Sequence, residues 1–412
     1  MFKKMMIVVL LMFLVVNVSL AHAQEKKPDI VGEYGVAIDA NTKNILYDKN
    51  AQEKAYPASM TKVITAMVLD EKMEDGAMLT ASKNAAGQEC SCFGLTPGEK
   101  ISKEDAIYAL LLVSANDVAV MIAENVAGSV KNFSKLMNEK AKEIGAKNTH
   151  FVTPNGLHDP EHYTTPYDMA LIAREAMNHP TVIKAMGTKE KSVKVYTKEI
   201  DEKGKEKEVE SEKIATNHGK FFNQKYVIAG KTGFTSAAGN TLVEVLQKGD
   251  KKIVSVVMKS RPNQTYHDIA QMADYAFPQM KTKKVLTKGE KVGKVKVGNQ
   301  EISVKAPQDF VISYTKGEEK SIKTSVKPLY HSLSEVQAGQ KIATLSVTVN
   351  GKEAKTFALV SDRTIKEVKP KEEFMWKNVL IGIAIPIPFY IFYLIRQSRA
   401  KKKGSLVEKK NS

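Results

Sequence analysis

Five apolar runs bounded by turn residues predict strands at both ends of the first two thirds of the chain. The first two runs flank Ala40-Asn41-Thr42-Lys43, which is typical of a β-hairpin, and Lys248-Gly249-Asp250 is the turn between the last two. We expect one five-stranded antiparallel sheet, built from both ends of a domain and covered by helices. The runs are 34–39, 44–47, 226–229, 241–246 and 253–258.

Helical patterns fill the sequence between these strands. Residues 59–69 are apolar almost all round, which predicts a helix buried in the middle of the domain. Residues 104–144 have a helical pattern with a break near Ser114, and 165–177 form a further amphipathic helix. The Lys- and Glu-rich stretch 189–213 is typical of a solvated hairpin or loop, and we assign it no function. These elements predict a mixed α/β (α+β) domain over 24–280.

The pattern changes near residue 280 to short alternating strands separated by glycine turns. We expect a small all-β domain over 281–368, and no set of catalytic residue types stands out in it. A polar linker, 369–373, follows.

The two ends of the chain predict export and anchoring. Residues 1–23 have the basic start, the apolar run and the small-x-small end of a signal peptide, with an uncleaved anchor helix as the alternative. Residues 379–395 are apolar and uncharged, and basic residues follow at once. We expect a transmembrane helix over 374–395 and a basic cytoplasmic tail over 396–412, so that the protein is secreted across the cytoplasmic membrane and anchored to its outer face. The alternative is an interfacial helix.

The formal charge of +16 invites a nucleic-acid interpretation, so its distribution matters. The predicted signal peptide and the segment from Trp376 onward hold ten of the 62 basic residues but only one of the 46 acidic ones, which leaves a net charge of +7 for the middle. Much of the excess is therefore a targeting feature, and the rest suits an anionic cell wall or membrane surface. We expect no nucleic-acid partner.

Two cysteines, Cys90 and Cys92, are too few for a disulfide framework. A bridge across one intervening residue makes a small ring, so we expect two free thiols, with a labile disulfide and half a metal site as alternatives. Because no His/Cys cluster has zinc spacing, we expect no metal.

Three short motifs carry candidate chemistry, namely Ser59-Met60-Thr61-Lys62, Ser114-Ala115-Asn116 and Lys231-Thr232-Gly233. Each one alone is weak evidence, because Ser-x-x-Lys arises by chance about once or twice in a chain of this length. We expect Ser59 at the start of the apolar helix, with Lys62 one turn away on the same face. Burial and a second cation lower a lysine pKa, and a neutral lysine activates a serine. The alternative is an N-cap serine with a lysine that reaches to solvent.

The other two motifs have informative surroundings. Ser114 and Asn116 interrupt an apolar segment, so they either make structural hydrogen bonds or line a cleft. Lys231 and Thr232 end a predicted strand between Gly230 and Gly233, where glycine permits a close approach of backbone to ligand.

In this order the three motifs resemble those of active-site serine penicillin-binding proteins and β-lactamases. The chain resembles the low-molecular-mass D-alanyl-D-alanine carboxypeptidases in particular, from about Pro28 to the end of the small β domain. The segments that carry the resemblance are YPASMTK, LLVSANDVA, FVTPNGLHDPEHYTTPYDMALIAR and GKTGFTSAAGN.

The resemblance implies a β-lactamase/DD-peptidase-like fold, a role for each motif residue and no cofactor. It implies that Ser59 attacks the carbonyl between two D-alanines with Lys62 as general base, while Ser114 and Lys231 pass a proton to the leaving group. Peptidoglycan stem peptides are the implied substrates, and β-lactams the implied inhibitors. The implied substrate-binding residues are Asn116, Lys231, Thr232, Gly233 and Phe234, with the N–H groups of Ser59 and Phe234 as oxyanion hole.

Some features depart from the family pattern. The cysteines are not typical of it, and Asn155 stands where a histidine is frequent. Arg261 is a weak candidate for the basic side chain that binds the substrate carboxylate. A class A β-lactamase is the first alternative, but its Glu-x-x-Leu-Asn loop is missing here. The second is a non-catalytic cell-wall-binding or sensor protein on the same fold.

Overall fold

The computed structural model describes residues 26–89, 91–200, 202, 205–298 and 300–366. The expected signal peptide, transmembrane segment and basic tail lie outside these residues. Among the described residues, no helix has both the length and the apolar character that crossing a membrane requires.

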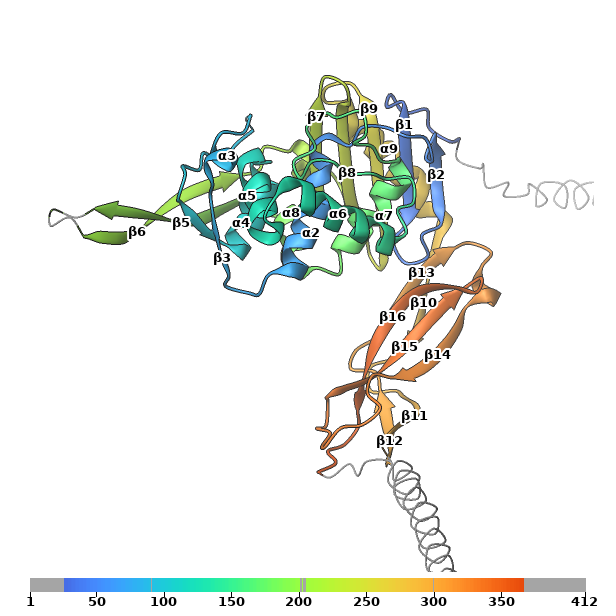
Figure 1. Ribbon diagram of the computed structural model, residues 1–412. Helices are drawn as coiled ribbons and strands as arrows, with labels where there is room; N and C mark the ends of the chain where they lie inside the picture. Colours follow the sequence, from blue (N-terminus) through green and yellow to red (C-terminus); the bar gives the residue numbers. More distant parts are fainter. Residues whose placement is uncertain (1–25, 90, 201, 203–204, 299, 367–412) are drawn as a thin grey trace, which may run out of the picture. The chain divides into compact units, whose positions relative to one another are not determined.

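The central sheet has the strand order β2-β1-β9-β8-β7, with antiparallel pairing (Figure 1). The amino-terminal strands lie beside strands from the far end of the domain, and Tyr34 pairs with Met258. The predicted five-stranded sheet is therefore correct. Its strands are β1 (Tyr34–Asp39), β2 (Ile45–Lys49), β7 (Val227–Thr235), β8 (Gly239–Lys248) and β9 (Lys251–Ser260).

In β1, β8 and β9, alternate residues enter two different cores, as the two-residue period of a strand requires. Val36 and Ile38 face a large core that the helices of the predicted helical region complete. Ala37 and Leu242 face a smaller core on the opposite side, closed by Ile269 of α9 (Gln264–Ala276). Both faces of the sheet are thus covered, and β7 holds the third motif, Lys231-Thr232-Gly233, within this packed frame.

The helical region has two breaks, whereas the sequence predicts one. The expected break falls at 113–115, and a second falls at Gly128 and Ser129. Gly128 takes a left-handed conformation (φ 72°) that ends α5, and the Ser129 side chain accepts a hydrogen bond from Asn132 N to start α6. The helices are α2 (Lys62–Lys72), α3 (Lys83–Ala86), α4 (Lys103–Leu112), α5 (Asn116–Ala127), α6 (Val130–Ile144), α7 (Pro166–Ala176) and α8 (Pro180–Met186).

The Lys- and Glu-rich stretch is a long hairpin of β5 (Glu190–Ile200) and β6 (Glu206–Thr216). It extends a small sheet of order β3-β4-β5-β6, in which β3 is Met78–Thr80 and β4 is Lys100–Ser102. Cross-strand ion pairs such as Lys194–Glu210 at 2.8 Å are exposed, so they contribute little stability.

The chain divides into two compact units. The first comprises the described residues up to Lys284 with Val311–Lys323 and Thr348–Lys355, and the second comprises Val285–Phe310, Thr324–Val347 and the described residues from Thr356. From residue 280 onward the described elements are strands and one 3-10 turn, so the expected all-β character is confirmed. They are β10 (Met280–Leu286), β11 (Lys291–Val297), β12 (Gln300–Lys305), β13 (Phe310–Thr315), η4 (Glu319–Ser321), β14 (Lys323–Pro328), β15 (Lys341–Val349) and β16 (Lys352–Ser361).

One carboxyl group on the central sheet is buried without a hydrogen-bond partner among the described residues. Glu244 of β8 is 0% exposed, and neither of its side-chain oxygens has a hydrogen-bond partner among the described residues. It pairs in register with Gly230 and with Ser255, whose hydroxyl is also buried and unpaired. Burial raises the pKa of Glu244 well above its usual 4.5 and so favours the neutral form of the carboxyl.

Glu244→Leu is expected to stabilise the fold, by about 1–3 kcal/mol near pH 7, because an unpaired buried polar group is removed. Because the folded pKa of this carboxyl is raised, its contribution to the free energy of unfolding is fully present below the unfolded pKa. That contribution is lost as the pH rises from the unfolded pKa through the folded pKa. The gain from Glu244→Leu should therefore grow with pH above about 4.5. Urea unfolding at several pH values measures it. Glu244→Gln, which removes only the titration, is the matched control, and an equal or lower stability of the leucine variant would contradict the expectation.

Candidate active site

Ser59 lies on a 3-10 turn, η1 (Ala58–Thr61), directly before α2. The sequence predicts Ser59 at the start of an α-helix, but the α-helix begins one turn later, at Lys62. Ala58, just before Ser59, has a positive φ of 49°. The turn is wedged between two glycines. A Cβ on Gly156 would lie 2.0 Å from Ala58 O, and a Cβ on Gly233 would lie 2.8 Å from Ser59 N. Only glycine permits this approach, so both glycines fix the position of Ser59.

The side-chain nitrogen of Lys62 is the centre of a hydrogen-bond cluster. Lys62 is 0% exposed, and its Nζ contacts Ser59 Oγ at 3.0 Å, Asn116 Oδ1 at 2.7 Å and Asn155 O at 2.8 Å. Burial lowers the pKa of Lys62 well below its usual 10.5, and the charge of Lys231 lowers it further.

These partners decide which way a neutral Lys62 points its lone pair. The two carbonyl oxygens, from Asn116 and Asn155, can only accept, so they take the two N–H bonds of the amine. The lone pair is then left for Ser59 Oγ, which has a hydrogen to donate. The arrangement can therefore take a proton from the serine and leave an activated nucleophile.

Lys231 and Ser114 form a second pair on the other side of the site. Lys231 Nζ donates to Ser114 Oγ at 3.0 Å and to Thr232 O at 2.9 Å. Lys231 is 3% exposed, and burial lowers its pKa to about 7. Ser114 has a φ of 61°, a left-handed conformation that turns its hydroxyl out of the α4–α5 connection toward Lys231. Lys231 lies inside β7, so the expectation that its motif ends a strand is wrong.

Asn116 connects the first motif to the loop between α3 and β4. Its amide oxygen accepts from Lys62, while its amide nitrogen donates to Glu89 O at 2.7 Å and its backbone N–H to Ser91 O at 2.8 Å. Asp117 accepts from the backbone N–H groups of Phe93, Gly94 and Leu95, which fixes the same loop. Both ends of the Asn116 amide are therefore engaged, and a ligand that contacts it has to share or replace one of these bonds.

The segment 153–164 packs against the turn that bears Ser59 and contacts its neighbours Thr61 and Lys62. His162 Nε2 lies 2.8 Å from Thr61 Oγ1, and its Nδ1 accepts from the backbone N–H of Val152 at 3.0 Å. Burial lowers the pKa of His162 to about 4, so the ring is neutral and holds its neighbours by hydrogen bonds alone. The sequence contains no signal that singles out His162, because a lone histidine in a loop has no periodicity or spacing.

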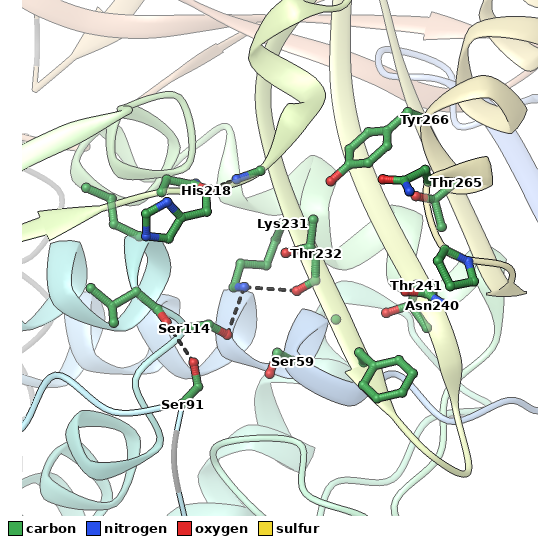
Figure 2. Close-up of a pocket in the computed structure, with 18 residues that line it drawn as sticks. Ser59, Ser91, Ser114, His218, Lys231, Thr232, Asn240, Thr241, Thr265 and Tyr266 are labelled. Carbon is green, nitrogen blue, oxygen red and sulfur yellow. Dashed lines mark hydrogen bonds between the residues drawn. The ribbon is translucent and has the colours of Figure 1, made fainter.

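Ser59, Ser114, Lys231, Thr232, Gly233 and Phe234 line one cavity of about 530 Å³. Figure 2 shows the hydrogen bonds that join Lys231 to Ser114 and Thr232 inside it. The predicted site residues are thus brought together, with Asn116 reached through Lys62. The sequence did not indicate the remaining polar lining, which includes Ser91, Asn217, His218, Asn240, Asn263 and Tyr266.

Two family models match the chain. Residues 21–262 match the D-alanyl-D-alanine carboxypeptidase model, and 281–367 match the model of the penicillin-binding protein 5 C-terminal domain. The chain belongs to the D-alanyl-D-alanine carboxypeptidase family.

Several known proteins are similar to the chain over most of their own length. The chain is 32% identical to the D-alanyl-D-alanine carboxypeptidase DacF of Bacillus subtilis, over 77% of this chain and 81% of that one. Penicillin-binding protein 5 of Haemophilus influenzae has a similar structure, with a TM-score of 0.56 and 26% identity over 82% of this chain and 99% of that one. The Streptomyces K15 DD-transpeptidase matches 61% of this chain and 99% of its own, with a TM-score of 0.56 and 27% identity.

Two expectations at the edge of this carboxypeptidase site need revision. Arg261 is exposed and is not among the residues that line the cavity, although Pro262 and Asn263 are. The expectation of two free thiols is wrong, because Cys92 is disulfide-bonded and no described cysteine is free. Asp117 already holds the following backbone in a fixed turn, a constraint that cysteine spacing does not reveal. Cys90 lies outside the described residues.

Proposed function

We propose that this chain is a serine-type D-Ala-D-Ala carboxypeptidase that removes the terminal D-alanine from peptidoglycan stem pentapeptides. The observation that carries the proposal is the contact between buried Lys62 Nζ and Ser59 Oγ at the wall of the cavity. A buried amine with a lowered pKa is suited to act as a base at neutral pH.

Each residue has a step in this reaction. Ser59 Oγ attacks the carbonyl carbon of the D-Ala-D-Ala bond as its proton passes to Lys62, and the N–H groups of Ser59 and Phe234 stabilise the oxyanion. The C–N bond then breaks, and Ser114 and Lys231 pass the proton taken up by Lys62 to the departing D-alanine nitrogen. Water hydrolyses the ester on Ser59 and regenerates the hydroxyl. Asn116 and Thr232 hold the peptide and its carboxylate.

A pair of assays on the purified protein tests the proposal. Incubation with a fluorescent penicillin should give a stable covalent adduct, because the β-lactam acylates Ser59, and incubation with a D-Ala-D-Ala peptide should release D-alanine. Rapid hydrolysis of the drug would instead support a class A β-lactamase. Absence of both reactions would support a non-catalytic cell-wall-binding or sensor protein.

We also propose that the chain is exported and anchored at the outer face of the membrane, with the catalytic domain over 24–280 and the β domain over 281–368. The apolar segment 379–395 and the basic residues after it support this proposal. No cofactor, metal or nucleic acid enters the proposed reaction.

Deleting residues 374–412 is expected to release a soluble enzyme with unchanged turnover of a D-Ala-D-Ala peptide. The segment removed contains the predicted anchor, whereas the catalytic motifs lie between residues 59 and 234. Fractionation of the secreted protein and an assay of each fraction measure the outcome. Truncated protein that stays with the membranes would show that another surface anchors the chain.

A further inference from the structure

An exposed apolar loop of the second unit stands out from the rest of its surface. Among the described residues of that unit, the large apolar side chains that are exposed are Leu329 and Tyr330, with 47% and 42% of their surface accessible. Both follow directly on β14, in the connection that leads to β15. The two adjacent side chains form a small exposed apolar patch.

Backbone hydrogen bonds hold the loop in place at both ends. Leu329 N donates to Ile342 O at 2.9 Å, and Gly298 N donates to His331 O at 2.7 Å. Leu329 is thereby bonded to β15 and His331 to Gly298, which follows β11, so the backbone is held on both sides of Tyr330. The exposure is therefore built into the fold of the second unit.

A few residues after the loop, the chain pairs with the end of the described residues, from which the sequence leads to the predicted membrane segment. Val336 and Ile365 pair through two backbone hydrogen bonds of 2.9 and 2.7 Å. Lys366 is the last described residue, and the twelve residues 367–378 connect it to the apolar segment 379–395. The same unit has exposed lysines, among them Lys296, Lys327 and Lys366.

We propose that the 329–331 loop contacts the membrane surface, with Leu329 and Tyr330 inserted among lipid headgroups and lysines paired with anionic lipids. The inference rests on the proposed anchorage. Two apolar side chains are too few for a stable protein interface, which buries about 800 Å² on each partner. They suffice for a lipid contact in a tethered chain, because the tether makes the contact intramolecular. Tyrosine and lysine are residues that favour the membrane interface.

Depth-dependent quenching tests the contact on the full chain. The single tryptophan is first removed with Trp376→Phe, and Leu329→Trp then places the only indole in the loop. The protein is reconstituted in phosphatidylcholine/phosphatidylglycerol vesicles with brominated acyl chains. We expect the emission to fall at least twofold relative to unbrominated vesicles. The matched control is Ile200→Trp in the same background, because Ile200 is 76% exposed on β5 of the first unit, and there we expect no quenching.

The proposal would be overturned if bromination lowered the emission of the two variants by the same factor relative to unbrominated vesicles. Protein that fails to float with the vesicles would overturn the anchorage and this contact with it. D-alanine release, measured on the same samples, reports the proposed function separately, because neither substitution lies in the catalytic cavity.

Discussion

Ser59→Ala is expected to abolish covalent labelling by penicillin and to reduce D-alanine release to background. The hydroxyl is the atom that forms the ester, and no neighbouring group can replace it, since Ser114 is engaged with Lys231 at 3.0 Å. The fold should be unaffected, because the Ser59 side chain contributes one hydrogen bond, to Lys62. Gel fluorescence after incubation with a labelled penicillin measures the loss.

Ser91→Ala is the matched control for this substitution. Ser91 lines the same cavity, but its hydroxyl donates to Val113 O at 2.9 Å and has no role in the proposed chemistry. This variant should label normally. Persistent labelling of the Ser59→Ala protein, with native-like circular dichroism, would show that a different residue is acylated.

Lys62→Arg is expected to lower the acylation rate by on the order of 10²–10⁴, the usual contribution of a positioned general base. Arginine keeps the charge but does not lose its proton at accessible pH, so it cannot take the proton of Ser59. In the unsubstituted protein, the acylation rate should rise with pH along a limb well below 10.5, because the pKa of Lys62 is lowered by burial and by Lys231. Stopped-flow measurements of acylation between pH 5 and 10 test both expectations.

Lys103→Arg provides a comparison of the same chemical change at another buried lysine. Lys103 makes ion pairs with Asp70 and Asp75 at 3.4 and 2.9 Å, a setting that arginine can also satisfy. We expect near-native acylation from this variant. A Lys62→Arg protein that acylates at a comparable rate would mean that Lys62 is structural and that another group acts as base.

The strand pattern of the catalytic domain could be predicted because its signal is local. Runs such as 34–39 are apolar, bounded by turn residues and long enough to be strands, and β1 has those bounds in the structure. The ends of β7 could not be predicted, because Lys231 and Thr232 are polar and glycines flank them. Pairing with β8 in register, Lys231 with Val243, carries the strand through these residues.

The three motifs could be found in the sequence, but their supporting contacts could not. Lys62 meets the backbone of Asn155, and Thr61 meets His162, only because a distant loop packs against the turn that bears Ser59. Such contacts depend on tertiary structure and leave no periodicity behind. The resemblance to a known family indicated the segment that contains this loop, but it did not indicate the function of each residue in the segment.

The placement of β1 next to β9 also governs how the enzyme becomes active. Tyr34 cannot reach Met258, nor Asp39 reach Ile253, until nearly the whole domain has been synthesised. Ser59 follows β2, whereas Gly233, which packs against the Ser59 backbone, lies in β7, so the two meet only when these long-range pairings close. Non-local pairings of this kind make folding slow compared with helical domains. The site around Ser59 therefore forms late in folding. The rate at which penicillin labelling recovers after dilution from denaturant measures how fast the sheet is completed.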